Sequence, residues 1–242
     1  MKKILKKQAS PKNPKKGNAN AGKSTLNPPF AAVTNYPSPM AAAPMPMSNQ
    51  AKIDFIEVRF REIMQVLGLD LTNPSLSKTP NRNAQMYVEE IFSGLDLSKF
   101  TEISFVDDDF DFEKHRNIIM VKVSFTSFCE HHFVPMEGYA YVAYIPKDKL
   151  IGLSKIPRIV RFFARRPQLQ ERLTAQIADS LSILLETEDV AVSIQATHHC
   201  VMARGIEDRH SYTTSNVLRG TFMSESSAKH EFFEAINRNV SM

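Results

Sequence analysis

The chain has 242 residues, 43% of them hydrophobic and 23% charged, which is enough to bury a substantial core in a globular protein. Its net charge of +4 divides unevenly: residues 1–50 hold eight lysines and no acidic residue, which leaves about −4 on the other 192 and gives no indication of nucleic-acid binding. No run of 18 apolar residues predicts a membrane span, and two cysteines cannot form a disulfide framework, so we expect a cytoplasmic protein without membrane or nucleic-acid partners.

Residues 1–50 differ in composition from the rest. They contain eight of the fourteen prolines and no regular hydrophobic period, which predicts a disordered basic tail. Within it, "GNANAGKS" (Gly17 to Ser24) matches the phosphate-loop pattern G-x-x-x-x-G-K-[ST]. Such a loop needs a strand before it and a helix after it, and the prolines on both sides favour neither. We therefore assign no nucleotide site to the tail.

Residues 51–98 read as an N-terminal helical region. From Ile53 onward, apolar residues recur at helical spacing and predict an amphipathic helix carrying Ile56, Phe60, Ile63 and Leu67. Thr79 followed by Pro80 is typical of an N-cap and first turn, so a second helix is expected there, ending at Gly94.

Residues 99–242 carry the pattern of an α+β domain. The acidic run at 106–115 predicts a solvated loop. Alternating or apolar runs then predict four strands, at 117–128, 138–146, 189–201 and 210–218. Between the strand pairs we expect a short helix over 155–166 and a long one from Pro167 to about Glu186, and the chain closes with a helix over 225–237.

The two cysteines suggest a metal site. Cys129 and His132 are three residues apart just past a predicted strand, and Cys200 lies at the far end of another. If those strands are neighbours, two thiolates and one imidazole would hold zinc and leave a fourth position for water. The alternative is two buried structural cysteines beside a surface histidine, since free cysteine is among the most buried residue types. Spacing alone does not decide between the two.

Two further histidines, His131 and His198, would lie beside such a metal and could transfer protons near neutral pH. Each alone could equally be a structural histidine, and we interpret His199 as structural or as a support for the ligands. A second cluster is basic: Lys155 and Arg158 follow Ser154 at a predicted helix start, which is typical of an anion site. Most of the neighbouring arginines could instead form a solvated helix face.

Glu171, in the first turn of the long helix, could accept two hydrogen bonds from the N1–H and amine of a guanine and reject adenine. An ordinary charge near a helix N-terminus explains the same residue. From the sequence pattern alone, the ordinary charge is the favoured interpretation.

Four stretches together resemble the GTP cyclohydrolase I family, with the likeness running from about Asp54 to Phe222. They are "FCEHHFVPMEGYAYVAYIP", "IGLSKIPRIVRFFARRPQLQERLTAQIADSL", "VAVSIQATHHCVMARGI" and "SYTTSNVLRGTF". The resemblance implies conversion of GTP and water to 7,8-dihydroneopterin triphosphate and formate, the first step of tetrahydrofolate or biopterin synthesis.

The resemblance also implies roles for individual residues. Zinc (Zn2+) would be held by Cys129, His132 and Cys200, with His131, His198 and Ser154 in catalytic positions. Guanine would be recognised at Gln170 and Glu171, and the triphosphate at Arg82, Ser154, Lys155, Arg158 and Arg204. One position departs from the family pattern: Gln85 stands where a basic residue is usual, which predicts weaker GTP binding.

The fold that the resemblance implies is the tunnelling fold, an antiparallel four-stranded sheet backed by two antiparallel helices. The usual assembly is a homodecamer of two pentamers with sites between subunits, where Arg82 would reach a neighbour's site. Two other hypotheses remain: a catalytically silent relative that forms a ring scaffold, and the related nitrile reductase of queuosine synthesis. The retained Cys/His set argues against the first. The absence of another nucleophilic cysteine argues against the second.

Overall fold

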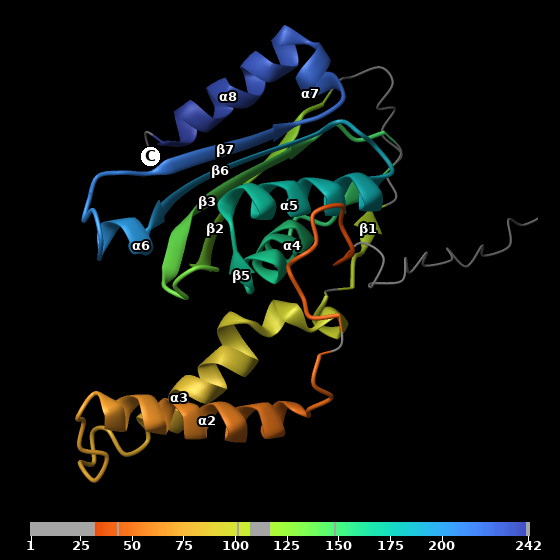
Figure 1. Ribbon diagram of the computed structural model, residues 1–242. Coiled ribbons are helices and arrows are strands. Elements are labelled where there is room, and N and C mark those ends of the chain that lie inside the picture. The colour runs from red at the N-terminus through yellow and green to blue at the C-terminus, as the bar shows by residue number, and fades with distance from the viewer. Residues whose placement is uncertain (1–31, 43, 101, 107–116, 148, 241–242) are drawn as a thin grey trace, which may run out of the picture.

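The computed structural model describes residues 32–42, 44–100, 102–106, 117–147 and 149–240. It has an α+β fold, as the sequence pattern predicts, with a helical N-terminal region followed by a curved sheet that has helices on both faces (Figure 1). The phosphate-loop match and nearly all of the acidic run lie outside the described residues. No helix within the described residues is long and apolar enough to cross a membrane.

The main sheet has the strand order β5-β2-β3-β6-β7. Its four long strands are antiparallel to their neighbours and confirm the four predicted ones: β2 (Ile119–Cys129), β3 (Pro135–Tyr144), β6 (Val190–His198) and β7 (Thr213–Leu218). The fifth, β5 (Pro167–Gln168), pairs in parallel with the end of β2. A separate two-stranded sheet joins β1 (Phe105–Val106) and β4 (Leu150–Ile151).

The helices correct some predicted boundaries. The long helix begins at Gln170 rather than Pro167, because Gln168 accepts a hydrogen bond from the Glu130 N–H at 3.0 Å as part of β5. Lys78, not Thr79, occupies the cap position of the second helix, since the Thr79 N–H is already bonded to a preceding turn. The helices are α2 (Asn49–Val66), α3 (Thr79–Gln85), α4 (Lys155–Ala164), α5 (Gln170–Leu185), α6 (His199–Met202), α7 (Thr221–Ser224) and α8 (Ser226–Val240).

Three short helical turns connect α3 to the sheet domain: the π-helix η1 (Met86–Ile91) and the 3-10 turns η2 (Ser93–Leu95) and η3 (Leu97–Lys99). Gly94 lies within η2 and does not close a helix. Its N–H donates to the Arg165 carbonyl at 2.9 Å, and a Cβ at this position would come within 2.0 Å of the Phe162 carbonyl oxygen. Only glycine therefore allows the N-terminal region to approach the end of α4 this closely.

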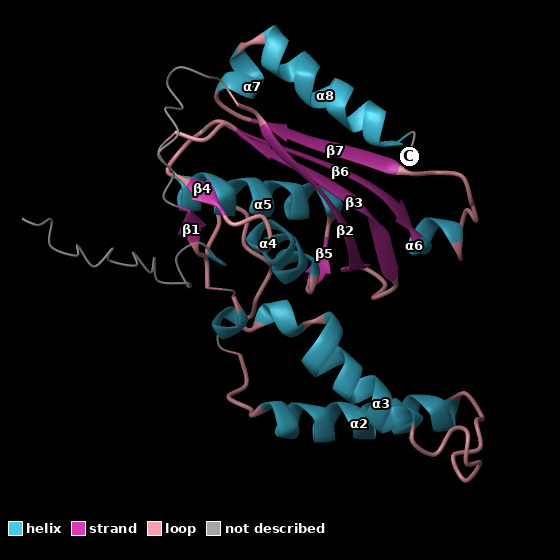
Figure 2. Ribbon diagram, turned by 180° about the vertical axis from the view of Figure 1, so that it is seen from behind, coloured by secondary structure: helices cyan, strands magenta, loops and turns pink. Residues whose placement is uncertain are grey.

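Two cores form on opposite faces of the sheet, because alternate residues of each strand point to opposite sides. Helices α4 and α5 cover one face, where β3 contributes Ala140 and Val142 and β6 contributes Ile194. Helices α7 and α8 cover part of the other face, where Tyr141 packs with Phe232 (Figure 2). Both residues are at most 1% exposed.

Residues 32–38 differ from the predicted disordered tail. Ala32 is 4% exposed and belongs to the core between the sheet and α4/α5. The Asn35 N–H donates to Asp179 Oδ2 at 2.8 Å, and Gln176 Nε2 donates to the Tyr36 carbonyl at 2.7 Å. These bonds hold the segment against α5, because they satisfy polar groups of α5 that are almost fully buried.

Candidate active site

The strand register brings the two cysteines together. In the β3–β6 pairing, Met136 lies opposite His198, so the end of β6 meets the start of β3 beside the β2–β3 turn. Cys129 ends β2, His132 lies in that turn, and Cys200 lies in α6 directly after β6. Their candidate ligand atoms all lie within 4.8 Å of one another, so the predicted convergence of these three side chains is confirmed.

The donor set fits a zinc ion. Cys129 Sγ and His132 Nδ1 are 3.8 Å apart, close to the spacing of two ligands that sit about 2.0–2.3 Å from one tetrahedral ion. Two thiols and one imidazole are the donor types that zinc prefers, and three protein ligands leave a coordination position open. Among the residues that the structure describes, this is the one group of three or more His, Cys, Asp or Glu side chains whose possible ligand atoms lie close enough together to hold a metal ion.

Neighbouring groups shift the pKa of the Cys200 thiol in this cluster. Burial raises the pKa of the Cys200 thiol, and the hydrogen bond and charge of Cys129 raise it further, while the Arg204 charge lowers it. A metal ion binds the thiolate, so a dication would reverse the direction of this shift. Arg204 Nη1 lies 3.0 Å from His132 Nε2. A guanidinium only donates, so a bond here needs a lone pair on Nε2, whereas zinc on Nδ1 would leave the hydrogen of the neutral ring on Nε2. Metal binding through Nδ1 therefore breaks this bond.

His198 and His131 both lie next to the cluster, at different depths. His198 ends β6, and its Nε2 is 2.7 Å from Gln170 Oε1. Burial lowers the pKa of His198, and the Glu171 charge raises it in part. The His131 side chain is 63% exposed, with Nδ1 4.0 Å from Cys129 Sγ and Nε2 3.9 Å from Glu130 Oε1. His199 points elsewhere, to Glu137 Oε1 at 3.3 Å.

An ion pair that the sequence analysis missed supports the metal-binding turn. Arg172 of α5 donates from Nη1 to Glu130 Oε2 at 2.5 Å and from Nη2 to Oε1 at 3.3 Å. The side chains of Arg172 and Glu130 are 17% and 18% exposed. Glu130 lies between Cys129 and His131, so this two-pronged contact anchors the turn to α5. No spacing rule could have found it, because the two partners lie far apart in the sequence.

The predicted triphosphate-binding residues do not gather in one place within the chain. Ser154 is the N-cap residue of α4, and Lys155 and Arg158 lie about 14 Å and about 9 Å of helix from its end at Ala164. That end leads into β5, which pairs beside Cys129. Lys155 Nζ donates to the Glu102 carbonyl at 2.8 Å, on the side of β1 and β4. Arg82 and Gln85 lie exposed on α3, and only Arg204 contacts the Cys/His cluster.

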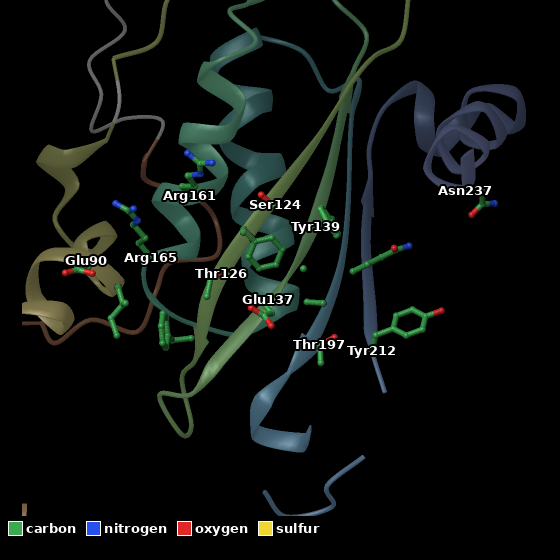
Figure 3. A pocket seen from close by; sticks show the side chains of 16 residues that line it. Glu90, Ser124, Thr126, Glu137, Tyr139, Arg161, Arg165, Thr197, Tyr212 and Asn237 are labelled. Carbon is green, nitrogen blue, oxygen red and sulfur yellow. The ribbon is translucent and has the colours of Figure 1, made fainter. Parts of the chain in front are cut away.

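One cavity crosses β2, β3 and β6 on the sheet and is not lined by the Cys/His cluster. It measures about 1130 Å³ and runs along β2, with Arg161 and Arg165 of α4 on one side of the strand and Tyr139 and Tyr212 on the other (Figure 3). Among the described residues, β2 from Ile119 to Ser127 has a strand partner on one side only. The cavity therefore includes an uncovered edge, and we do not interpret it as a substrate pocket.

Fold and site together define the class: an α+β protein with a partly exposed Cys/His metal-type cluster just past the ends of β2 and β6, which both pair with β3, and with the His131 ring beside Cys129. The family model of GTP cyclohydrolase I matches residues 56–237. A GTP cyclohydrolase 1 of Aeromonas salmonicida (strain A449) is 54% identical over 187 residues, covering 77% of this chain and 84% of that protein.

The GTP cyclohydrolase 1 of Escherichia coli (strain K12 / DH10B) is 50% identical over 193 residues, 80% of this chain and 86% of its own length. That of Klebsiella pneumoniae subsp. pneumoniae is 49% identical over 202 residues, 84% and 90% of the two chains. The chain therefore belongs to the GTP cyclohydrolase I family and is an enzyme of this kind, which confirms the resemblance read from its motifs.

Proposed function

We propose that this enzyme converts GTP and water to 7,8-dihydroneopterin triphosphate and formate, with zinc held by Cys129, His132 and Cys200. The observation that carries the proposal is the convergence of these three side chains, with His131 beside Cys129, in a member of this family. The product would enter tetrahydrofolate or biopterin synthesis. We propose a cytoplasmic location from the cysteine content.

The proposed chemistry assigns each side chain a task. When bound, zinc lowers the pKa of water and supplies the nucleophile for guanine C8. Glu171 accepts hydrogen bonds from the guanine N1–H and amine. His198 gives a proton to N7, and its lowered pKa makes its protonated form a stronger acid at neutral pH. His131 moves protons at the ribose, where its exposed ring remains free to turn.

The triphosphate would be held by Lys155, Arg158 and Arg204, with Ser154 near the substrate and Arg82 reaching in from another copy. In one chain, the start of α4 is separated from the Cys/His cluster by the length of that helix. A second copy that brings the start of its own α4 to this cluster would complete a site that uses both groups. We propose that sites form between subunits for this reason.

We further propose the tunnelling fold and a homodecamer of two pentamers. Two features favour this assembly. The first is that β2 and β7 are the outer long strands of the sheet, each with an edge that no described strand covers along most of its length, and edge pairing between identical chains closes a ring. The second is α2, where the apolar side chains of Phe55, Ile63 and Val66 are 47%, 53% and 88% exposed. An apolar helix face of this kind is suited to a second ring.

The test is to incubate the purified, zinc-loaded protein with GTP and to follow formate release and the absorbance of the pterin product. ATP serves as the matched control nucleotide. We expect both signals with GTP and neither with ATP, and a mass in solution equal to ten chains. Absence of formate with GTP would overturn the proposed reaction, whereas a smaller mass would overturn only the assembly.

A further inference from the structure

The side-chain amide of Gln170 is fully engaged inside the chain. Gln170 begins α5 and is 1% exposed. Its Nε2 donates to the Ile194 carbonyl at 3.0 Å and to the Thr213 carbonyl at 2.9 Å, and lies 3.1 Å from Ser215 Oγ. Both carbonyls can only accept, so the orientation of the amide follows from its partners.

This orientation leaves Gln170 Oε1 facing His198 Nε2 at 2.7 Å. An amide oxygen only accepts hydrogen bonds, so the Nε2 of His198 carries a hydrogen. The neutral imidazole has one N–H and one lone pair, and its lone pair is then on Nδ1.

We propose that Gln170 is a positioning residue that holds the His198 ring in the Nε2–H tautomer. This inference rests on the proposed function, in which His198 protonates the guanine N7. It differs from the guanine-recognition role that the family resemblance implies for Gln170. That role would need a side-chain amide free to meet the base, and both polar atoms of this amide already have partners within the chain.

The surrounding bonds make the orientation rigid. Thr174 Oγ1 donates to the Gln170 carbonyl at 2.8 Å and lies 2.6 Å from Ser215 Oγ. The amide thus joins the start of α5 to β6 and β7. If the amide nitrogen and oxygen exchanged places, the oxygen would face the carbonyl oxygens of Ile194 and Thr213, and both carbonyls would lose their donor. The free-energy cost of these losses exceeds the gain from any single hydrogen bond that the exchanged amide could form.

The first experiment is the substitution Gln170→Met in the zinc-loaded protein, which keeps the length of the side chain and removes its hydrogen bonds. We expect kcat for formate release to fall about 100-fold and KM for GTP to stay within about twofold, as for loss of a tautomer-fixing partner. The matched control is Ser215→Ala, which removes a neighbour of the amide and leaves the bond to His198, and we expect it to keep kcat within about twofold. A rise in KM with kcat retained would overturn the proposal, because it would show substrate recognition.

The second experiment combines Gln170→Met with His198→Ala. If Gln170 acts only through His198, the double variant releases formate at the rate of His198→Ala alone. A further loss of rate would overturn the proposal and assign Gln170 a structural role.

A third measurement does not require that any Gln170 variant folds. Two-bond nitrogen–proton correlation spectra of the 15N-histidine-labelled native protein, assigned by comparison with His198→Ala, report the tautomer of His198 directly. The proposal requires the Nε2–H form, and the Nδ1–H form would overturn it. If the native protein shows the Nε2–H form but releases no formate, the proposed function fails while the assignment of the tautomer stands.

Discussion

The metal-binding corner and the triphosphate-binding residues are organised in opposite ways. Cys129, His132 and Cys200 come from separate strand ends, yet meet within 4.8 Å in one chain. Lys155 and Arg158 lie at the far end of α4, and Arg82 is exposed on another helix. The difference follows from the backbone: β2 and β6 both pair with β3, which aligns the ends that carry Cys129 and Cys200, whereas the start of α4 lies at the opposite end of that helix from β5, which pairs beside Cys129. We propose that one copy prepares the metal site and that a second copy completes the anion site.

The largest effect is expected from Cys200→Ser, which removes one of the two thiolates. We expect loss of bound zinc and a fall in formate release of at least about 1,000-fold, because the open-site metal is the source of the nucleophile. Zinc content and formate release are measured together. The control is His199→Ala, at the neighbouring position, whose side chain contacts Glu137. It should keep its zinc, and an active Cys200→Ser protein with a full zinc load would contradict the assignment.

The next prediction tests whether the metal ligands and the phosphate-binding residues of one site come from different subunits. We expect Cys200→Ser and the double variant Lys155→Ala/Arg158→Ala each to lose activity, and their co-expression to restore about a quarter of the native rate. In a random mixed assembly, about one site in four would combine an intact metal corner with an intact anion group from the neighbouring copy. Recovery is measured as formate released per chain, zinc-free chains included. No recovery would place both groups in the same chain.

A smaller effect is expected from Gln85→Lys, which restores a cation at an exposed position of α3. One added charge-assisted contact to phosphate is worth roughly 1–2 kcal/mol, so KM for GTP should fall about 5- to 30-fold with kcat unchanged. Gln65→Lys adds the same charge to the exposed side of α2 and serves as the control. An unchanged KM in Gln85→Lys would remove this position from the anion site.

The smallest effect on turnover is expected at the N-terminal segment, whose described residues Asn35 and Tyr36 bond to α5. We expect deletion of residues 1–31 to leave both turnover and unfolding temperature unchanged, although it removes the phosphate-loop match. Deletion of residues 1–47 should lower the free energy of unfolding by about 1–3 kcal/mol. The reason is that Asp179 Oδ2, a buried carboxylate oxygen, loses the Asn35 N–H that donates to it. Denaturant unfolding measures the difference. A loss of turnover in the shorter deletion would instead favour a functional phosphate loop.

Much of the fold could be predicted because its signals are local. The alternation of buried Val123 and Phe125 with exposed Ser124 and Thr126 marks β2 in the sequence and in the structure alike. The predicted helices occur, with shifted ends where a tertiary partner intervenes: β5 takes the place of the first turn of α5 because its backbone bonds to the end of β2. Residues 32–38 escaped prediction because their order depends on buried groups of α5, a helix far away along the chain.

The sequence by itself determined which reactive groups this protein carries: two thiols, one imidazole predicted to bind metal, and two further histidines. The two-residue alternation of apolar side chains marks the strands, and these groups lie at or just past the ends of those strands. Only the tertiary structure decided which of these groups meet and what holds them. The register of β3 against β6, the Glu130–Arg172 pair and the bond from His198 to Gln170 are examples. The physical reason is that a hydrogen bond or ion pair depends on positions within a few ångströms, which residues far apart along the chain reach only when the whole sheet and its helices are in place.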